Sequence, residues 1–213
     1  MVRNILYLIV LMFVNLSIVF GQKPKNVFLI KFSAVDLILG DQCTKSWSPN
    51  IVLEKGLNHR FSSQLELACI LPDNITDKSF LFIDIDHIIG FKFNPELKKY
   101  IGDGQNTLSG LSISIDCNST YTKATVSYSE AIVNRLVLSP HLKVGFQSIS
   151  RSNLVFDISA GLGPGFVFSN SSIKKEDLGI LSYHRNILYE GGSGVYLSYY
   201  FNINVGKLIK ENK

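Results

Sequence analysis

The clearest pattern in the chain is a strict alternation of apolar and polar residues near its end. From Gly194 to Gly206 the odd positions carry valine, leucine, isoleucine or aromatic side chains, and the even positions are mostly small or polar. Side chains alternate across a β-strand with a period of two, so this segment predicts a strand with one apolar and one polar face. Its length exceeds that of an average globular strand and suits a tilted strand that crosses a bilayer.

The same alternation recurs upstream and predicts eight strands in total. The expected strands cover residues 27–39, 48–57, 61–71, 89–100, 110–117, 135–146, 154–168 and 193–206. The first is the least regular, because Asp36 interrupts its apolar face, and Pro140 counts against the sixth since proline donates no ladder hydrogen bond. No amphipathic helix is expected. The fold class predicted is an all-β, eight-stranded, antiparallel up-and-down transmembrane barrel.

The spacing of these strands supports a barrel of the outer-membrane type. Each odd-numbered connection is longer than the even-numbered connections beside it, as expected where outer loops are long and periplasmic turns are short. We expect the long loops 72–88, 118–134 and 169–192 to face outward and to carry any extracellular ligand. Aromatic residues near both ends of the strands predict a girdle at each membrane interface, formed by Phe28, Trp47, Phe61, Phe82, Tyr100, Phe146, Phe166 and Phe168.

The amino-terminal 21 residues predict a cleaved signal peptide. Arg3 is followed by an apolar run from Ile5, and Val19 and Gly21 supply small residues before the expected cleavage site. The alternative is an uncleaved anchor, which the short, interrupted run does not favour. Residues 22–213 would then form one barrel domain. Removing residues 1–21 takes away Arg3 alone, so the net charge falls from +4 to +3, too little to suggest nucleic-acid binding.

Charged residues within the strands fall on the polar face and predict a network inside the barrel. An interior of eight strands is just filled by side chains, so opposite charges there are expected to pair. The residues expected in this lumen network are Glu54, Glu66, Lys92, Glu96, Lys98, Arg135, His141, Lys143 and Asp157. The alternative is a path for protons or ions.

Candidate chemistry outside this network is sparse. Asp86 and His87 adjoin a predicted loop, and a carboxylate can orient a histidine that acts as a general base. We interpret the pair instead as part of a solvated acidic loop, so we expect no enzyme. No metal or cofactor site is expected. Cys43, Cys69 and Cys117 match no metal-binding spacing, and an odd number cannot all pair within the chain.

Four segments resemble a known group of proteins. The runs 90–100, 108–114, 156–166 and 196–204 are similar to strands of small Bacteroidetes-type outer-membrane barrels of unknown function, with the eight-stranded OmpA-type architecture. The resemblance implies a place in the bacterial outer membrane, contact with its lipid and insertion by the barrel-assembly machinery. Such barrels usually end on an aromatic residue, whereas here a charged tail follows Gly206 unless the strand runs on to Leu208 or Ile209.

The leading functional hypothesis is therefore a small, non-enzymatic outer-membrane barrel with a structural or loop-mediated binding role. A second hypothesis is a secreted or periplasmic lipocalin-like carrier, in which the apolar faces would turn inward around a lipophilic ligand. A third is an outer-membrane barrel hydrolase, which would require Asp86 and His87 to approach a nucleophile or a bound water.

Overall fold

The computed structural model describes residues 27–39, 47–58, 60–71, 85–101, 108–126, 132–172 and 192–210, without the side chains of 38, 39, 85, 86, 126 and 210. The predicted signal peptide at 1–21 lies outside these residues, as do Phe82 and Cys43.

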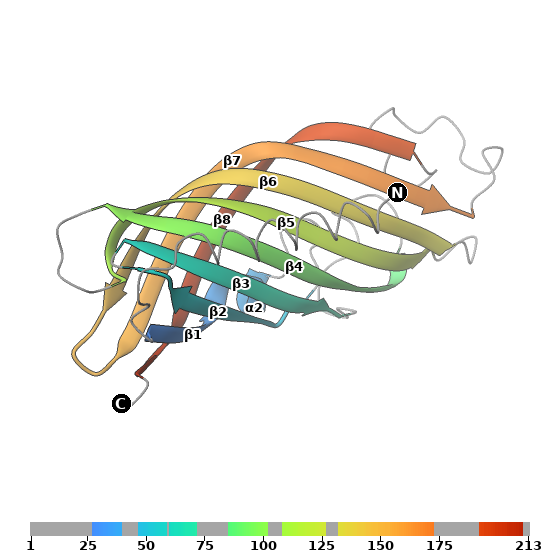
Figure 1. Cartoon of the computed structure of the whole chain (residues 1–213). Coiled ribbons are helices and arrows are strands. Elements are labelled where there is room, and N and C mark those ends of the chain that lie inside the picture. The colour runs from blue at the N-terminus through green and yellow to red at the C-terminus, as the bar shows by residue number, and fades with distance from the viewer. Residues whose placement is uncertain are drawn as a thin grey trace.

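Eight antiparallel strands form one closed up-and-down barrel, in which each strand pairs with its neighbours in sequence (Figure 1). The strands are β1 (Val27–Ser33), β2 (Asn50–Gly56), β3 (Phe61–Ile70), β4 (Ile85–Ile101), β5 (Gly110–Val126), β6 (Ile132–Ile149), β7 (Leu154–Ser171) and β8 (Gly192–Lys210). Pairing of β1 with β8 closes the ring and runs from Val27 opposite Lys210 to Ser33 opposite Asn204. The predicted all-β fold of eight antiparallel strands is confirmed.

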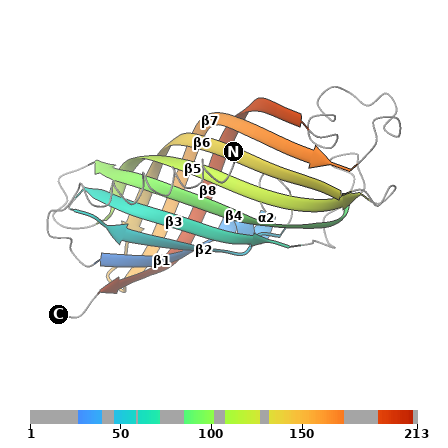
Figure 2. The same ribbon diagram turned by 45° about the vertical axis from the view of Figure 1, so that its right-hand side comes forward.

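The strands differ in length around the barrel. β1 and β2 have 7 residues each and β3 has 10, whereas β4 to β8 have between 17 and 19. The long strands therefore extend well past the short ones at one end of the molecule (Figure 2). We call this the loop side; the opposite end, where residues 57–60, 102–109 and 150–153 connect the strands, is the turn side.

The predicted loops are shorter than expected. β5 continues to Val126 and β6 starts at Ile132, so most of the predicted loop 118–134 is strand. Threonines at 120 and 122 face inward while Tyr121 and Lys123 face outward, and β-branched and aromatic residues favour strands. β4 begins at Ile85, which shortens the loop expected at 72–88, and the connection expected at 169–192 spans 172–191. The predicted alternation of loop lengths fails at 127–131, which is shorter than 102–109.

The end of the first predicted strand is a short helix, α2 (Ala34–Leu39), and the expectation of a strand to residue 39 is wrong. Ser33 caps this helix, because its Oγ accepts a hydrogen bond from the Asp36 backbone N–H at 3.0 Å. The helix also turns the Asp36 side chain into the barrel, where it is buried. Asp36 therefore interrupts the apolar face because the alternation stops at Ser33.

Proline does not end β6, and residues 207–210 of the charged tail belong to β8. Pro140 pairs with Cys117 of β5, while the pairing with β7 skips from Leu138 to Leu142. Pro140 has no backbone N–H to donate, and the pairing of β6 is interrupted only on the side that faces β7. β8 runs through Lys207 to Lys210 against β1, so the closing strand extends four residues past Gly206.

The aromatic residues predicted for the girdle mostly face outward. Trp47, Phe146 and Phe168 are exposed, and Phe28, Phe61 and Phe166 are half-buried on the outer face. Tyr100 is the exception and its assignment is wrong: the side chain is 4% exposed and its hydroxyl donates to Glu54 inside the barrel. Even-numbered residues of β4 point inward, so the alternation itself places Tyr100 with the lumen.

Candidate functional site

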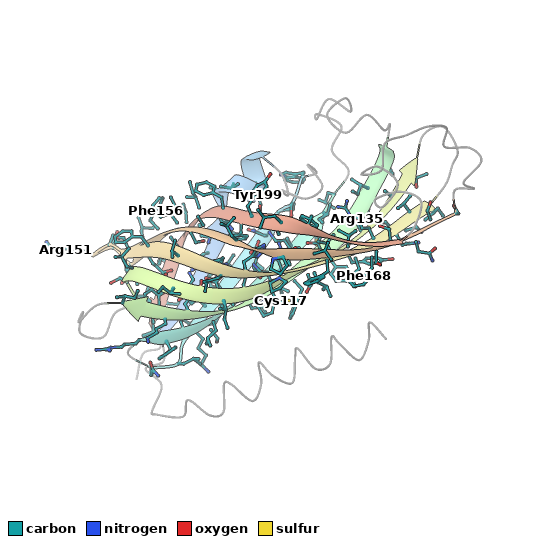
Figure 3. All side chains as sticks on the ribbon, turned by 90° about the horizontal axis from the view of Figure 1, so that it is seen from above. Cys117, Arg135, Arg151, Phe156, Phe168 and Tyr199 are labelled. Atoms are coloured by element: carbon teal, nitrogen blue, oxygen red, sulfur yellow. The ribbon has the colours of Figure 1, made fainter. Side chains whose placement is uncertain are left out.

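The interior of the barrel is filled by charged and polar side chains. Eight residues of the predicted network point inward and are at most 4% exposed: Glu54, Glu66, Lys92, Glu96, Lys98, His141, Lys143 and Asp157. Arg135 lies on the inward face of β6 but is half-buried and closer to the loop side (Figure 3). The structure thus brings the network together and divides it into three clusters along the barrel.

The turn-side cluster is centred on Lys31 of β1. The Lys31 Nζ donates to carboxylates of Glu54 at 2.7 Å and Asp157 at 2.6 Å. Two amide oxygens complete its surroundings, those of Gln64 at 2.7 Å and Gln147 at 3.0 Å. These contacts join β1, β2, β3, β6 and β7. An ammonium surrounded by four acceptors is compensated although no water reaches it.

A second lysine completes the turn-side cluster from β4. Lys98 donates to Asp157 Oδ2 at 2.7 Å, so that one carboxylate oxygen serves two lysines. Glu54 Oε1 accepts hydrogen bonds from Tyr100 at 2.6 Å and Ser62 at 2.5 Å. Two lysines and two carboxylates make this cluster neutral. Its charges are therefore balanced within one layer of the interior.

The central cluster lies between β4, β5, β6 and β8. Lys143 contacts Glu96 at 2.5 Å and Asp116 at 2.8 Å. Asp116 also contacts His141 Nδ1 at 2.8 Å, and His141 Nε2 lies 2.8 Å from the hydroxyl of Ser198. Gln64 donates to Glu96 at 3.0 Å and connects this layer to the turn-side cluster.

The order carboxylate, imidazole and hydroxyl is the one used by serine hydrolases. Here Asp116, His141 and Ser198 are each at most 5% exposed, and Lys143 holds the same carboxylate. The arrangement is a structural one, because the hydroxyl is packed inside a filled barrel where it satisfies the histidine. Asp116, His141 and Ser198 therefore each have a buried partner, as polar groups shielded from solvent require.

The loop-side cluster is built around Asp36 of α2 and Glu66 of β3. Asn50 donates to both carboxylates, at 2.8 Å and 2.9 Å respectively. Lys92 also reaches both, at 3.2 Å to Asp36 and 2.9 Å to Glu66. Asn94 adds a hydrogen bond to Glu66 at 3.2 Å. Two carboxylates therefore share a single lysine in this layer.

Tyr200 of β8 occupies the space between the central and loop-side clusters. Its ring centroid lies 4.0 Å from Lys143 Nζ and 5.9 Å from Lys92 Nζ, distances at which a cation is attracted to the ring. Gly161 and Gly163 lie on β7, the strand next to β8, and Gly161 is the register partner of Tyr200. A Cβ at Gly161 would meet the Lys143 side chain, and one at Gly163 the Pro140 carbonyl oxygen.

The three clusters contain more carboxylates than lysines. Besides the half-buried Arg135, the described interior contains four lysines and six carboxylates. The lysines are Lys31, Lys92, Lys98 and Lys143; the carboxylates are those of Asp36, Glu54, Glu66, Glu96, Asp116 and Asp157.

The weaker candidates lie apart from this network. His87 is exposed on the outer face of β4, paired in the ladder with Thr125, and Asp86 precedes it at an irregularity of the strand. Cys69 is exposed and Cys117 half-buried on the outer wall, and both are free thiols. Within the described part of the chain, no group of three or more His, Cys, Asp or Glu side chains is placed to hold a metal ion.

Sequence reasoning did not assign several members of the clusters to the network. Lys31 and Asp116 share a face with the residues that were identified, so the same alternation could have found them. The inward position of Asp36 depends on the helix α2, which the alternation does not predict. Its signal is a serine followed three residues later by an acidic residue, a pattern typical of a helix start.

Comparisons with known proteins leave this chain without a match: no protein-family model, no curated protein and no solved structure is similar to it. Among the described residues there is no helix with the length and apolar character needed to cross a bilayer.

Proposed function

We propose that this chain is a small integral protein of a bacterial outer membrane, non-enzymatic, with a lumen closed by its own side chains. The observation that carries the proposal is the inversion of polarity between the two faces of the wall. All six carboxylates and four of the lysines whose side chains the structure describes lie inside. A water-soluble domain of this size buries apolar side chains and solvates charges.

The outer wall has the opposite character. Large apolar side chains cover it on every long strand, with exposed fractions reaching 73% at Leu197 of β8. Others on the same wall include Phe91, Leu111, Ile115, Leu142, Val144, Leu162, Val195 and Tyr199. Soluble monomers rarely expose contiguous apolar patches beyond a few hundred Å². An apolar band around a closed barrel is what lipid chains solvate, and closure leaves no unpaired edge in the hydrocarbon.

The same observation disfavours the lipocalin-like carrier. A carrier of a lipophilic ligand needs an apolar cavity at the centre of the barrel. Here the centre is occupied by the ion pairs of Lys31, Lys98 and Lys143 with their carboxylates. An apolar ligand would have to break these pairs at a large cost in free energy.

A filled lumen leaves two roles for the protein: stabilising the envelope, or binding through the connections on the loop side. We place ligand binding in the connections from β3 to β4 and from β7 to β8, whose residues 72–84 and 173–191 lie outside the described part of the chain. In this proposal, outer-membrane lipid and the barrel-assembly machinery are the partners of the wall. The resemblance to small Bacteroidetes-type barrels belongs to the same proposal.

The experiment is fractionation of the expressed full chain, followed by electrophoresis with and without boiling. We expect the protein to sediment with outer membranes and to migrate differently when unheated, because a closed barrel retains its compact form in detergent. A variant with Leu197→Lys and Val144→Lys should fail to insert, since a lysine near the middle of the bilayer costs ~2–4 kcal/mol each. Ser193→Lys at the exposed end of β8 is the matched control.

Two results would contradict the proposal. A chain that is soluble without detergent and monomeric would show that the outer wall is not covered by lipid. Normal insertion of the double lysine variant would show that these positions do not face hydrocarbon. In either case the polarity of the wall would need a different explanation, such as coverage by a partner protein.

A further inference from the structure

The described outer surface of the barrel carries positive charge only, whereas the interior contains both signs. Every carboxylate side chain that the structure describes points into the barrel, and every strongly exposed charged side chain is basic. These exposed cations are Lys55, Arg60, Lys99, Lys123, Arg151 and Lys207. The outside of the described barrel is therefore positive.

Most of the exposed cations lie at the turn side. Lys55 is one residue from the end of β2, and Lys99 is two residues from the end of β4. Arg151 lies in the connection between β6 and β7, at the very end of the molecule in Figure 3. Lys207 pairs with Leu154 just after that connection. Lys123, near the loop-side end of β5, is the exception.

We define Lys55, Lys99, Arg151 and Lys207 as the basic belt. Its members belong to β2, β4, the β6–β7 turn and β8, so they are spread around the circumference of the barrel. A protein partner that docks on one side would contact only part of such a ring. A surface that surrounds the barrel at one height contacts all of it.

The surroundings of the belt are those of a membrane interface. Exposed apolar side chains lie next to it on the outer wall, among them Ile101, Leu154 and Ile209. The Lys99 ammonium lies 5.8 Å from the ring centroid of Phe61, which places a cation beside an aromatic residue at the strand end. Long basic side chains bury their stems in apolar surroundings while the charge reaches the headgroups.

Resting on the proposed function, we propose that the basic belt binds the phosphates of anionic phospholipids in the leaflet at the turn side. The phosphate supplies the negative charge that the outer surface of the described barrel lacks. Each cation near such a leaflet raises the local affinity for an anionic headgroup on the order of fivefold. The belt thereby fixes how deeply the turn-side end of the barrel sits in the membrane.

The test measures which lipids the barrel immobilises. The full chain is reconstituted in phosphatidylcholine vesicles that contain trace spin-labelled phosphatidylglycerol or spin-labelled phosphatidylcholine, and the motionally restricted fraction is recorded by electron paramagnetic resonance. We expect several-fold preference for phosphatidylglycerol. The variant Lys55→Gln, Lys99→Gln, Arg151→Gln and Lys207→Gln should lose it, whereas Lys123→Gln should keep it. High salt should also weaken the preference, because it screens exposed charges.

The outcomes separate this proposal from the one on which it rests. Restricted lipid of both kinds in equal amounts would overturn the basic belt while leaving the membrane barrel intact. The belt would also be overturned if the Lys123→Gln control lost the preference as fully as the fourfold variant. Absence of any restricted lipid, together with no gel shift on heating, would contradict the membrane barrel itself.

Discussion

The turn-side and loop-side clusters solve the problem of a charged interior in different ways. In the turn-side cluster, Lys31 and Lys98 face Glu54 and Asp157, so lysines and carboxylates are equal in number. In the loop-side cluster, Lys92 alone faces two carboxylates, one of which comes from a helix. The turn-side cluster thus has one lysine for each carboxylate, whereas the loop-side cluster has one lysine for two carboxylates.

The difference follows from where the strands end. β1 and β8 pair only as far as Ser33 and Asn204, so the turn-side layer is enclosed by a complete ring of strands. Above it, α2 takes the place of β1 beside β8 and carries Asp36 inward. The helix that begins where the pairing of β1 with β8 ends therefore also supplies the second carboxylate of the loop-side cluster.

The largest loss of stability is expected at Lys31, the centre of the turn-side cluster. Lys31→Met leaves Glu54 and Asp157 with one lysine and no water, and breaking a buried ion pair from one side costs ~3–5 kcal/mol. We expect this variant to lose most of its free energy of unfolding, measured by urea titration of the barrel folded in vesicles. Adding Asp157→Asn restores equal charge and should recover part of it. No recovery would show that packing, and not charge, determines the loss.

A matched pair of substitutions tests the comparison directly. Glu54→Gln leaves the turn-side cluster with an uncompensated lysine and should cost about 2–3 kcal/mol. Glu66→Gln leaves Lys92 with Asp36 as its carboxylate partner, and the new amide oxygen can still accept from Asn50, so we expect it to cost under about 1 kcal/mol. Equal losses in urea unfolding, or a larger loss at Glu66, would contradict the proposed difference between the two clusters.

The next largest loss of stability is expected at Gly163, in the wall beside the central cluster. An alanine at Gly163 would push its Cβ against the Pro140 carbonyl, where β6 and β7 already skip their pairing. Forcing these backbones apart should cost about 1–3 kcal/mol and lower the temperature of the gel shift. Gly56→Ala is the control, because its Cβ would meet only the Leu108 side chain at 3.4 Å. A Gly163→Ala barrel as stable as the control would contradict the close approach.

The smallest effect is expected at the buried serine of the central cluster. Ser198→Ala leaves His141 Nε2 without its partner and should destabilise the barrel by about 1 kcal/mol. Ser193→Ala on the exposed end of the same strand should change the free energy of unfolding by less than the error of the titration. An unchanged stability for Ser198→Ala would show that this hydroxyl does not satisfy the histidine.

Much of the barrel was predictable because alternation is a local property. Eight strands and the inward face of the network could be read from the sequence, since each side chain's face depends only on whether its position is odd or even. The errors lie where local rules compete. Ser33 and Asp36 start a helix inside an apolar alternation, and the threonines after Cys117 have the composition of a loop but the alternation of a strand.

The sequence by itself determined which side chains face the inside of the wall and which face outside, because that choice follows from the period of two along each strand. Tertiary structure decided which of the inward charges meet. Lys31 and Asp157 are 126 positions apart and touch only because closure of β1 on β8 sets the register of the ring. Register is a relation between strands, and no pattern within one strand contains it.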